Sequence, residues 1–121
     1  IAGKRIALVD DDESVRKALG RLLRAAGCSV AVYPSARAFI ESHCIQETDC
    51  LILDMRMEGM SGADLQTYLA YQGTNIPIIF ISGYADEAAR RLVTRLGAYA
   101  YLHKPIDELL LLNTLRQSVQ P

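Results

Sequence analysis

The sequence predicts an α/β fold in which five parallel strands form one doubly wound sheet with helices on both faces. Five short apolar or β-branched runs are separated by segments whose apolar residues recur at helical spacing. This alternation favours a parallel sheet with right-handed crossovers, and the near-continuous apolar strands agree because both faces of such a sheet are buried. An eight-stranded barrel needs about 250 residues. A chain of 121 residues therefore favours the open sheet.

The strands and the first helix are the clearest elements. The strands are expected at residues 5–9, 28–33, 50–53, 77–81 and 98–102. After the first strand, six apolar residues form one helical stripe, and Gly27 ends the pattern. The stripe contains Val15, Ala18, Leu19, Leu22, Leu23 and Ala26. The first helix is therefore expected to bury one face against the sheet.

The four later helices are expected from capping residues and apolar spacing. Ser35 is a good N-cap for a short second helix, and a third runs from about residue 63 to residue 72, before Gly73. Asp86 and Asp107 are the N-cap candidates for the fourth and fifth helices. The apolar residues that the fourth helix is expected to turn inward are Leu92, Val93 and Leu96.

Length and composition indicate one domain over residues 1–121, because 50% of the residues are hydrophobic and can form a sizeable core. The net charge of -1 gives no indication that this segment binds nucleic acid. No apolar stretch approaches the roughly 20 residues that span a bilayer, so no membrane association and a cytoplasmic location are expected. The three cysteines form no CxxC pair and are expected to be reduced. The first residue is Ile, which suggests a processed chain or an excised domain.

Carboxylates follow two of the expected strands. Asp10 and Asp11 follow the first strand and Asp54 the third, and in a 2-1-3-4-5 strand order these neighbours flank the topological switch point. Carboxylates without a nearby His or Cys suit Mg²⁺, which prefers oxygen ligands. Asp12 and Glu13 are interpreted instead as capping residues of the first helix. The sequence thus predicts a cation site at one edge of the sheet.

A hydroxyl and an ammonium are expected at the same edge. Ser82 ends the fourth strand beside Gly83, and Lys104 follows the fifth strand. Pro105 is a candidate for a cis peptide bond, which would aim the ammonium at the acids. These groups are consistent with Asp54 as a nucleophile that becomes esterified to phosphate, because phosphoryl transfer needs positioning and neutralised oxygens. A turn serine and a solvated lysine are the alternatives.

The chain resembles the response-regulator receiver domains of two-component signalling over essentially its whole length. The runs that carry the resemblance are ALVDDD, LILDMRMEGMSG and IIFISG, followed by Gly97-Ala98 and Lys104-Pro105. The resemblance implies a flavodoxin-like (βα)5 fold. It also implies Asp54 as phosphoacceptor, Asp11, Asp54 and the backbone carbonyl of Arg56 as Mg²⁺ ligands with Asp10 assisting through water, Ser82 and Lys104 as phosphate contacts, and Ser82 and Tyr101 as switch residues.

The resemblance further implies a signalling domain whose only chemistry is self-phosphotransfer and slow autodephosphorylation. A histidine kinase would supply the phosphoryl group. The motifs Val-Asp-Asp-Asp-Glu-Ser-Val-Arg, Ser-Ala-Arg-Ala-Phe and Ser-Gly-Tyr-Ala-Asp resemble receivers joined to a LuxR-type DNA-binding domain, such as nitrogen-fixation regulators. Leu109 to Leu112 are consecutive, so one or two must face outward. We therefore expect a homodimer surface on the fourth helix, fifth strand and fifth helix after phosphorylation.

Three positions depart from the pattern of the family, and two other functions were weighed. The family usually has Pro at Glu58, Thr at Ser82 and Phe at Ile106. A phosphatase with an Asp nucleophile would require a second Asp at position 56, which is Arg. A flavin carrier would require a hydroxyl and Gly loop after the first strand, where this chain has acids. A free-standing receiver that signals by protein contact stays an alternative to the transcription factor.

The resemblance also places two large side chains at the rim of the phosphate. They are Arg56, two residues after the acceptor, and Tyr84, two residues after Ser82. Neither orients water as well as a small amide or carboxylate would. We therefore expect a long-lived phosphorylated state, unless both side chains point into solvent.

Overall fold

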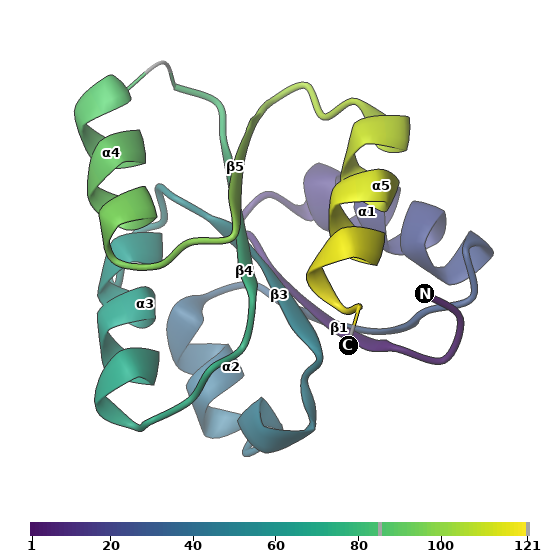
Figure 1. Ribbon diagram of the computed structural model, residues 1–121, viewed down its shortest axis with the longest axis horizontal. Coiled ribbons are helices and arrows are strands. Elements are labelled where there is room, and N and C mark those ends of the chain that lie inside the picture. The colour runs from purple at the N-terminus through teal and green to yellow at the C-terminus, as the bar shows by residue number, and fades with distance from the viewer. Residues whose placement is uncertain (85, 121) are drawn as a thin grey trace.

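The computed structural model describes residues 1–84 and 86–120. Ala85, in the Ser-Gly-Tyr-Ala-Asp motif, and Pro121, at the end of the expected domain, lie outside the described residues. The five strands are β1 (Arg5–Val9), β2 (Ser29–Tyr33), β3 (Cys50–Asp54), β4 (Ile78–Ser82) and β5 (Ala100–His103). All pair in parallel in the order β2-β1-β3-β4-β5, which confirms the predicted topology (Figure 1).

Helices cover both faces of this sheet. They are α1 (Glu13–Ala25), α2 (Ala36–Glu41), α3 (Gly62–Tyr71), α4 (Glu87–Arg95) and α5 (Glu108–Ser118). A short 3₁₀ helix, η1 (Ile45–Glu47), precedes β3 and was not among the expected elements. Figure 1 shows α1 and α5 on one side of the sheet and α2, α3 and α4 on the other, as in a doubly wound fold.

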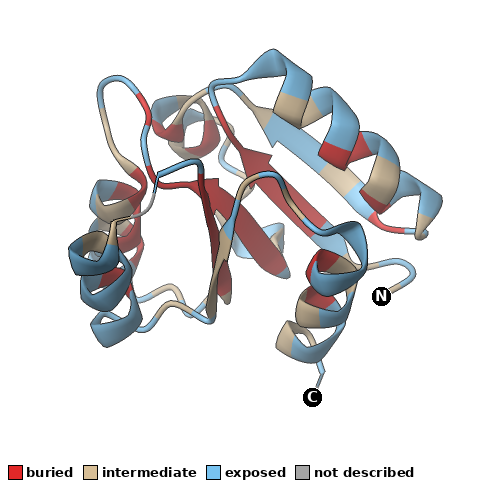
Figure 2. Ribbon diagram, turned by 90° about the horizontal axis from the view of Figure 1, so that it is seen from above, coloured by how far each residue is buried: buried red, intermediate tan, exposed pale blue. Residues whose placement is uncertain are grey.

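The core has two layers because alternate residues of a strand point to opposite faces of the sheet. On β3, Leu51 and Leu53 pack toward α2, α3 and α4, whereas Ile52 packs toward α1 and α5. Every residue of β3 and β4 is buried, and Figure 2 shows both strands in red between the helical layers. The residues at the carboxyl ends of these strands are therefore held by well-packed backbone.

The predicted helix caps are present. Ser35, Asp86 and Asp107 each accept a hydrogen bond from the backbone N–H three residues later. Asp12 accepts the backbone N–H groups of Ser14 and Val15 in the first turn of α1, which confirms its interpretation as a capping residue. Gly27 has a φ of +92°, in the left-handed region that favours glycine, so the first helix ends where the sequence predicted.

The prediction that the fourth helix turns three apolar residues inward is wrong for two of them. Val93 is buried, but Leu92 is 45% and Leu96 is 50% exposed. Ala89 and Val93 form one stripe that meets the core, and Leu92 and Leu96 form a second stripe about 100° away. Only one of these two stripes meets the sheet, because α4 lies beside β5, the last strand of the sheet.

The expectation that all strands are buried on both faces is wrong for the two edge strands, β2 and β5. No residue of β5 is buried, because it pairs with β4 alone. The same applies to β2. None of its five residues is buried, and Val32 is exposed. The reason is its place at the edge of the sheet, where it pairs with β1 alone. In α1, Ala18 is also exposed, so the buried stripe is narrower than the apolar stripe in the sequence.

Two expectations from composition concern the membrane and the cysteines. Among the described residues, no helix combines the length and apolar character needed to cross a bilayer. Cys28, Cys44 and Cys50 are free thiols, as predicted. Burial raises the pKa of the Cys50 thiol to about 11, so this thiol is protonated and unreactive at neutral pH.

Candidate functional site

Three carboxylates converge at the carboxyl ends of β1 and β3. Val9 and Leu53 are register partners on these adjacent strands, so the acids that follow them lie side by side. Asp10 is fully buried and Asp54 is only 4% exposed, whereas Asp11 is exposed. One oxygen from each of the three acids lies within 4.8 Å of the others. The structure thus brings together the acids that the sequence placed at this edge.

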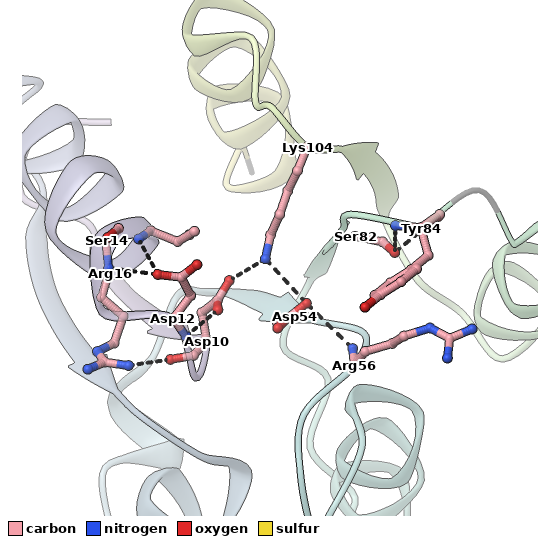
Figure 3. A network of polar contacts seen from close by, with 10 residues as sticks. Asp10, Asp12, Ser14, Arg16, Asp54, Arg56, Ser82, Tyr84 and Lys104 are labelled. Carbon is pink, nitrogen blue, oxygen red and sulfur yellow. Dashed lines mark hydrogen bonds and ion pairs between the residues drawn. The ribbon is translucent and has the colours of Figure 1, made fainter.

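Lys104 reaches this cluster from the end of β5. Its Nζ lies 2.9 Å from Oδ2 of Asp10 and 3.6 Å from Oδ1 of Asp54 (Figure 3). The peptide bond between Lys104 and Pro105 is cis. The two distances show that the ammonium is directed at the acids and is not a solvated strand-end lysine.

The charges at the site shift two pKa values. Burial, followed by repulsion from Asp10, raises the pKa of Asp54 to about 6, although Lys104 and the Arg56 backbone N–H act against this shift. Burial alone would lower the pKa of Lys104, but its hydrogen bonds to and attraction by Asp10 and Asp54 outweigh burial and raise it. Asp54 is therefore mostly ionised at neutral pH, yet its negative charge is poorly compensated.

The donor set fits a hard divalent cation. All donors are carboxylate oxygens, and no His or Cys belongs to the cluster. A bound cation would also relieve the repulsion that raises the pKa of Asp54. Of the two buried acids, Asp10 already accepts the Asp12 backbone N–H at 2.8 Å. Asp11 and Asp54 thus have oxygens free for a metal, and a contribution from the Arg56 carbonyl stays a prediction.

Ser82 occupies the end of β4, next to Asp54 on β3. Its side chain is buried, and its hydroxyl is bonded to the backbone of Tyr84: Oγ donates to the Tyr84 carbonyl at 3.2 Å and accepts from the Tyr84 N–H at 3.1 Å. In Figure 3 the hydroxyl turns toward this loop and does not contact Asp54. The predicted contact with an anion would require the hydroxyl to change partners.

Tyr101, predicted as the switch aromatic, is half-buried on β5 and packs against the α2, α3 and α4 layer. Its ring lies 5.5 Å from that of His103 in an edge-on arrangement. Its hydroxyl is buried and accepts or donates no hydrogen bond within the described residues. A buried hydroxyl without a partner costs about 1–3 kcal/mol. The Tyr101 hydroxyl gains no hydrogen bond in the present position of the ring. Another position of the ring, in which the hydroxyl finds a partner, could therefore replace it.

The structure adds a contact that the sequence did not reveal. Nη2 of Arg56 lies 3.1 Å from Oδ2 of Asp86, and the guanidinium lies 4.6 Å from the centre of the Tyr84 ring. The sequence identified Asp86 as a helix cap, and capping uses only its Oδ1. An N-cap Asp leaves its second carboxylate oxygen free to accept another donor. That free oxygen was the feature of the sequence that could have indicated this contact.

Two further contacts, one beside the site and one between α3 and α4, also involve residues that were not singled out. Nη1 of Arg16 donates to the Asp10 carbonyl at 2.8 Å, which holds the end of β1 against α1. Nε2 of Gln66 donates to the Val93 carbonyl at 3.0 Å and ties α3 to α4. Nothing in the sequence pattern distinguishes these side chains from solvated ones.

The site therefore combines a weakly compensated, ionised carboxylate with an ammonium and with acids whose oxygens are suited to a metal ion. Such a carboxylate can act as a nucleophile toward an electrophile with anionic oxygens, because Lys104 and a cation would neutralise those oxygens. The described residues place no His or Cys among the acids, so catalysis by a His or Cys base is not indicated.

Comparison with known proteins shows the family of this chain. A family model described as the response regulator receiver domain matches residues 6–116. The response regulator protein TmoT of Ectopseudomonas mendocina is 42% identical over 95% of this chain and 52% of its own length. The transcriptional regulatory protein FixJ of Azorhizobium caulinodans is 32% identical over 94% of this chain and 54% of its own length. The chain thus spans about half the length of these curated relatives.

Solved structures show the same fold. The response regulator StyR superposes with a TM-score of 0.90 at 40% identity, covering 98% of this chain and 60% of that one. FixJ-N superposes with a TM-score of 0.87 at 29% identity, covering 98% of this chain and 95% of that one. The likeness to FixJ-N extends over nearly the full length of both chains.

Proposed function

Because this chain belongs to the response regulator receiver domain family, we propose that it accepts a phosphoryl group from a histidine kinase on Asp54 and then changes the surface it offers to partners. The observation that carries the proposal is the position of Asp54. It is a buried carboxylate at the end of β3, close to Asp10 and Asp11 and 3.6 Å from Lys104. A purely structural role does not explain such a carboxylate, because its charge is only weakly compensated.

In the proposed transfer, an Asp54 oxygen attacks phosphorus in line with the bond to the kinase imidazole. A P–O bond forms, the P–N bond breaks, and its electron pair leaves with the imidazole nitrogen. The imidazole leaves as a neutral ring because its other nitrogen carries a proton. Lys104 neutralises one phosphoryl oxygen. Mg²⁺ held by Asp11, Asp54 and the Arg56 carbonyl, with Asp10 assisting through water, would neutralise the other oxygens. The domain supplies position and charge and needs no base.

The surface that changes is proposed to be the face of α4, β5 and α5. Leu109 is 69% exposed and Leu110 50%, whereas Leu111 is buried. Exposed adjacent leucines are suited to a contact between two copies of the domain, and Arg91 on α4 could pair with Glu108 across it. Arg90, in contrast, already pairs with Glu87 in its own helix.

An output domain is part of the same proposal. The relatives are about twice as long as this chain, and FixJ is described as a transcriptional regulatory protein. We therefore place the domain in a cytoplasmic transcription factor whose DNA-binding part is a separate domain. The net charge of -1 agrees that the receiver itself does not contact nucleic acid.

Intact-protein mass spectrometry after incubation with a small phosphodonor and Mg²⁺ tests the transfer. The wild-type chain should gain one phosphoryl group, and the Asp54→Asn variant none. Asp11→Asn should need a higher Mg²⁺ concentration, because it loses a metal ligand. Glu58→Gln is the matched control, since Glu58 is an exposed acid outside the carboxylate cluster. An Asp54→Asn protein that gains the group at the wild-type rate would refute the proposal.

A further inference from the structure

Arg56 connects the phosphoryl site to the first turn of α4. Its backbone N–H donates to Oδ1 of Asp54 at 3.4 Å, while its side chain runs away from that carboxylate, beneath the ring of Tyr84 (Figure 3). The guanidinium ends 3.1 Å from Oδ2 of Asp86. One residue thus touches the acceptor with its backbone and a distant helix with its side chain.

Asp86 uses its two oxygens for two different tasks. Oδ1 accepts the N–H of Ala89 at 3.0 Å and caps α4, while Oδ2 pairs with Arg56. The arrangement differs from that of the next acid, Glu87, which among the described residues pairs with Arg90 alone, in its own helix. A change at Arg56 therefore reaches the backbone of α4 through a single carboxylate.

The helix that Arg56 contacts through Asp86, α4, is weakly anchored. Of the nine residues of α4, only Val93 is buried, and Leu92 and Leu96 face solvent. Among the described residues, its polar contacts with other elements are the Arg56 contact at its start and the Gln66 bond to the Val93 carbonyl in its last turn. Elements with few buried apolar contacts open at low free-energy cost. Loss of the contact at the start of α4 should therefore loosen its first turn.

A phosphoryl group on Asp54 would compete with Asp86 for Arg56. Such a group carries close to two negative charges at neutral pH, against one on Asp86, and presents oxygens that match a guanidinium. The Arg56 backbone already lies beside Asp54, so a side-chain rotation suffices to exchange partners. The guanidinium is partly exposed, which makes this rotation sterically open.

We propose that Asp86 is a positioning residue that holds Arg56 off the phosphoryl site, so that the phosphoryl group and the α4 cap compete for one guanidinium. This inference rests on the proposed function. It couples two properties of the molecule. The stronger the Asp86 contact, the shorter the life of the phosphorylated state and the more ordered the first turn of α4.

The lifetime depends on Arg56 through hydrolysis. Water attacks phosphorus opposite the Asp54 oxygen, a new P–O bond forms, and the bond to Asp54 breaks with its electron pair returning to the carboxylate. The water loses a proton to solvent, and inorganic phosphate leaves. A guanidinium bound to the phosphoryl oxygens covers the approach of water and holds the group in place. Freeing Arg56 from Asp86 should therefore slow hydrolysis.

The test is a double-mutant cycle on the decay of the phosphorylated chain. Asp86→Asn removes the charge that attracts Arg56 but keeps an oxygen for capping, since Asn is as good an N-cap as Asp. In the wild-type background it should lengthen the phosphoryl half-life about threefold, equivalent to about 0.65 kcal/mol of barrier. In an Arg56→Gln background it should have no effect. Glu87→Gln, at the adjacent acid that does not touch Arg56, should leave the half-life unchanged in both backgrounds.

Hydrogen exchange of the α4 amides gives a second readout. Phosphorylation of the wild-type chain should speed exchange in the first turn of α4, and this increase should be absent in Arg56→Gln. Equal effects of Asp86→Asn in both backgrounds, or no effect in the wild-type background, would overturn the inference. A wild-type chain that acquires no phosphoryl group would instead overturn the proposed function, so the two failures are distinguishable.

Discussion

At the scale of single residues, Asp10 and Asp54 differ in how well their charges are compensated. Asp10 has a backbone donor at 2.8 Å and the ammonium of Lys104 at 2.9 Å. Asp54 has the same kinds of partner at 3.4 and 3.6 Å, and its pKa is raised to about 6 by burial and by Asp10. Shorter contacts bind more strongly. Asp10 is therefore a fixed support for Lys104, and Asp54 is the carboxylate that gains most from a new partner.

The first prediction concerns the lifetime of the phosphorylated state. Arg56 and Tyr84 stack on each other beside the site and are both exposed enough to move over it. Replacing them together, as Arg56→Asn and Tyr84→Ala, should open the approach of water and speed loss of the phosphoryl group about tenfold, or about 1.4 kcal/mol of barrier. The decay is measured by intact mass over time. If the double variant decays like the wild type, another feature sets the lifetime.

At the scale of elements, the start of α3 is packed against the end of β3. The N–H of Gly62 donates to the Met55 carbonyl at 3.1 Å. A Cβ at this position would lie 2.5 Å from the Asp54 carbonyl oxygen and 3.0 Å from Cε1 of Phe80. The first residue of α3 therefore has room for glycine alone, and its size helps to fix the backbone of the phosphoacceptor.

A second prediction follows for Gly62→Ala. Because the clash is with backbone rather than with a flexible side chain, the substitution should lower the free energy of unfolding by about 3 kcal/mol. It should also slow phosphorylation, since the Asp54 backbone must shift. Gly83→Ala is the control, because its Cβ would meet only Cδ of Lys104, at 3.9 Å, and it should cost less than about 1 kcal/mol. Urea titration measures both, and equal losses would show that α3 can move aside.

The third prediction concerns the exposed leucines of α5. Leu109 and Leu110 start the helix on its open side. If they form the dimer contact, the double variant Leu109→Ser and Leu110→Ser should weaken self-association of the phosphorylated domain at least tenfold, or about 1.4 kcal/mol. Sedimentation velocity over a concentration series measures this. Val32→Ser, on the opposite edge of the sheet, should leave association unchanged. A wild-type phosphorylated domain that stays monomeric at high micromolar concentration would contradict the dimer.

At the scale of the whole molecule, the site reduces the stability of the fold that carries it. β3 and β4 are buried along their full length, yet the ends of β1 and β3 place two buried carboxylates at one point. Burial of charge is unfavourable unless the charge is paired, and one ammonium serves both acids. The apolar core of the sheet therefore stabilises a fold that the two buried carboxylates destabilise.

The fourth prediction is a dependence of stability on pH. Asp54 has a pKa of about 6 in the folded chain against an ordinary value of 3.8, so the folded state binds more protons between these values. Stability from this group is present below about pH 4 and is lost as pH rises through 6. Asp54→Asn should therefore equal the wild type near pH 4 and exceed it by up to about 3 kcal/mol at pH 7. Chemical denaturation at both pH values measures the difference.

Adding Mg²⁺ distinguishes an effect of the raised pKa of Asp54 from a general effect of the Asp54→Asn substitution on stability. A cation that binds the acids would stabilise the ionised carboxylate and so should raise the stability of the wild type at pH 7. It should leave Asp54→Asn nearly unchanged. A wild-type advantage over Asp54→Asn at pH 7 without Mg²⁺ would contradict the raised pKa.

The sequence by itself determined the order of elements and the composition of the acid cluster. Both are local properties. Apolar spacing and capping residues such as Ser35 and Asp107 define each helix from within, and parallel strands must end at a common edge. Asp10, Asp54 and Lys104 each follow a strand directly, so their meeting point followed from the topology alone.

Only the tertiary structure decided which side of an element meets the core and which partner a polar side chain selects. Leu92 and Leu96 have the spacing of buried residues but face solvent, because α4 lies at the edge of the sheet. Asp86 was recognisable as a cap, but its second oxygen meets Arg56, thirty positions away in the sequence. Such pairings depend on which distant residues the loops bring together. The spacing of apolar residues along the sequence carries no information about that.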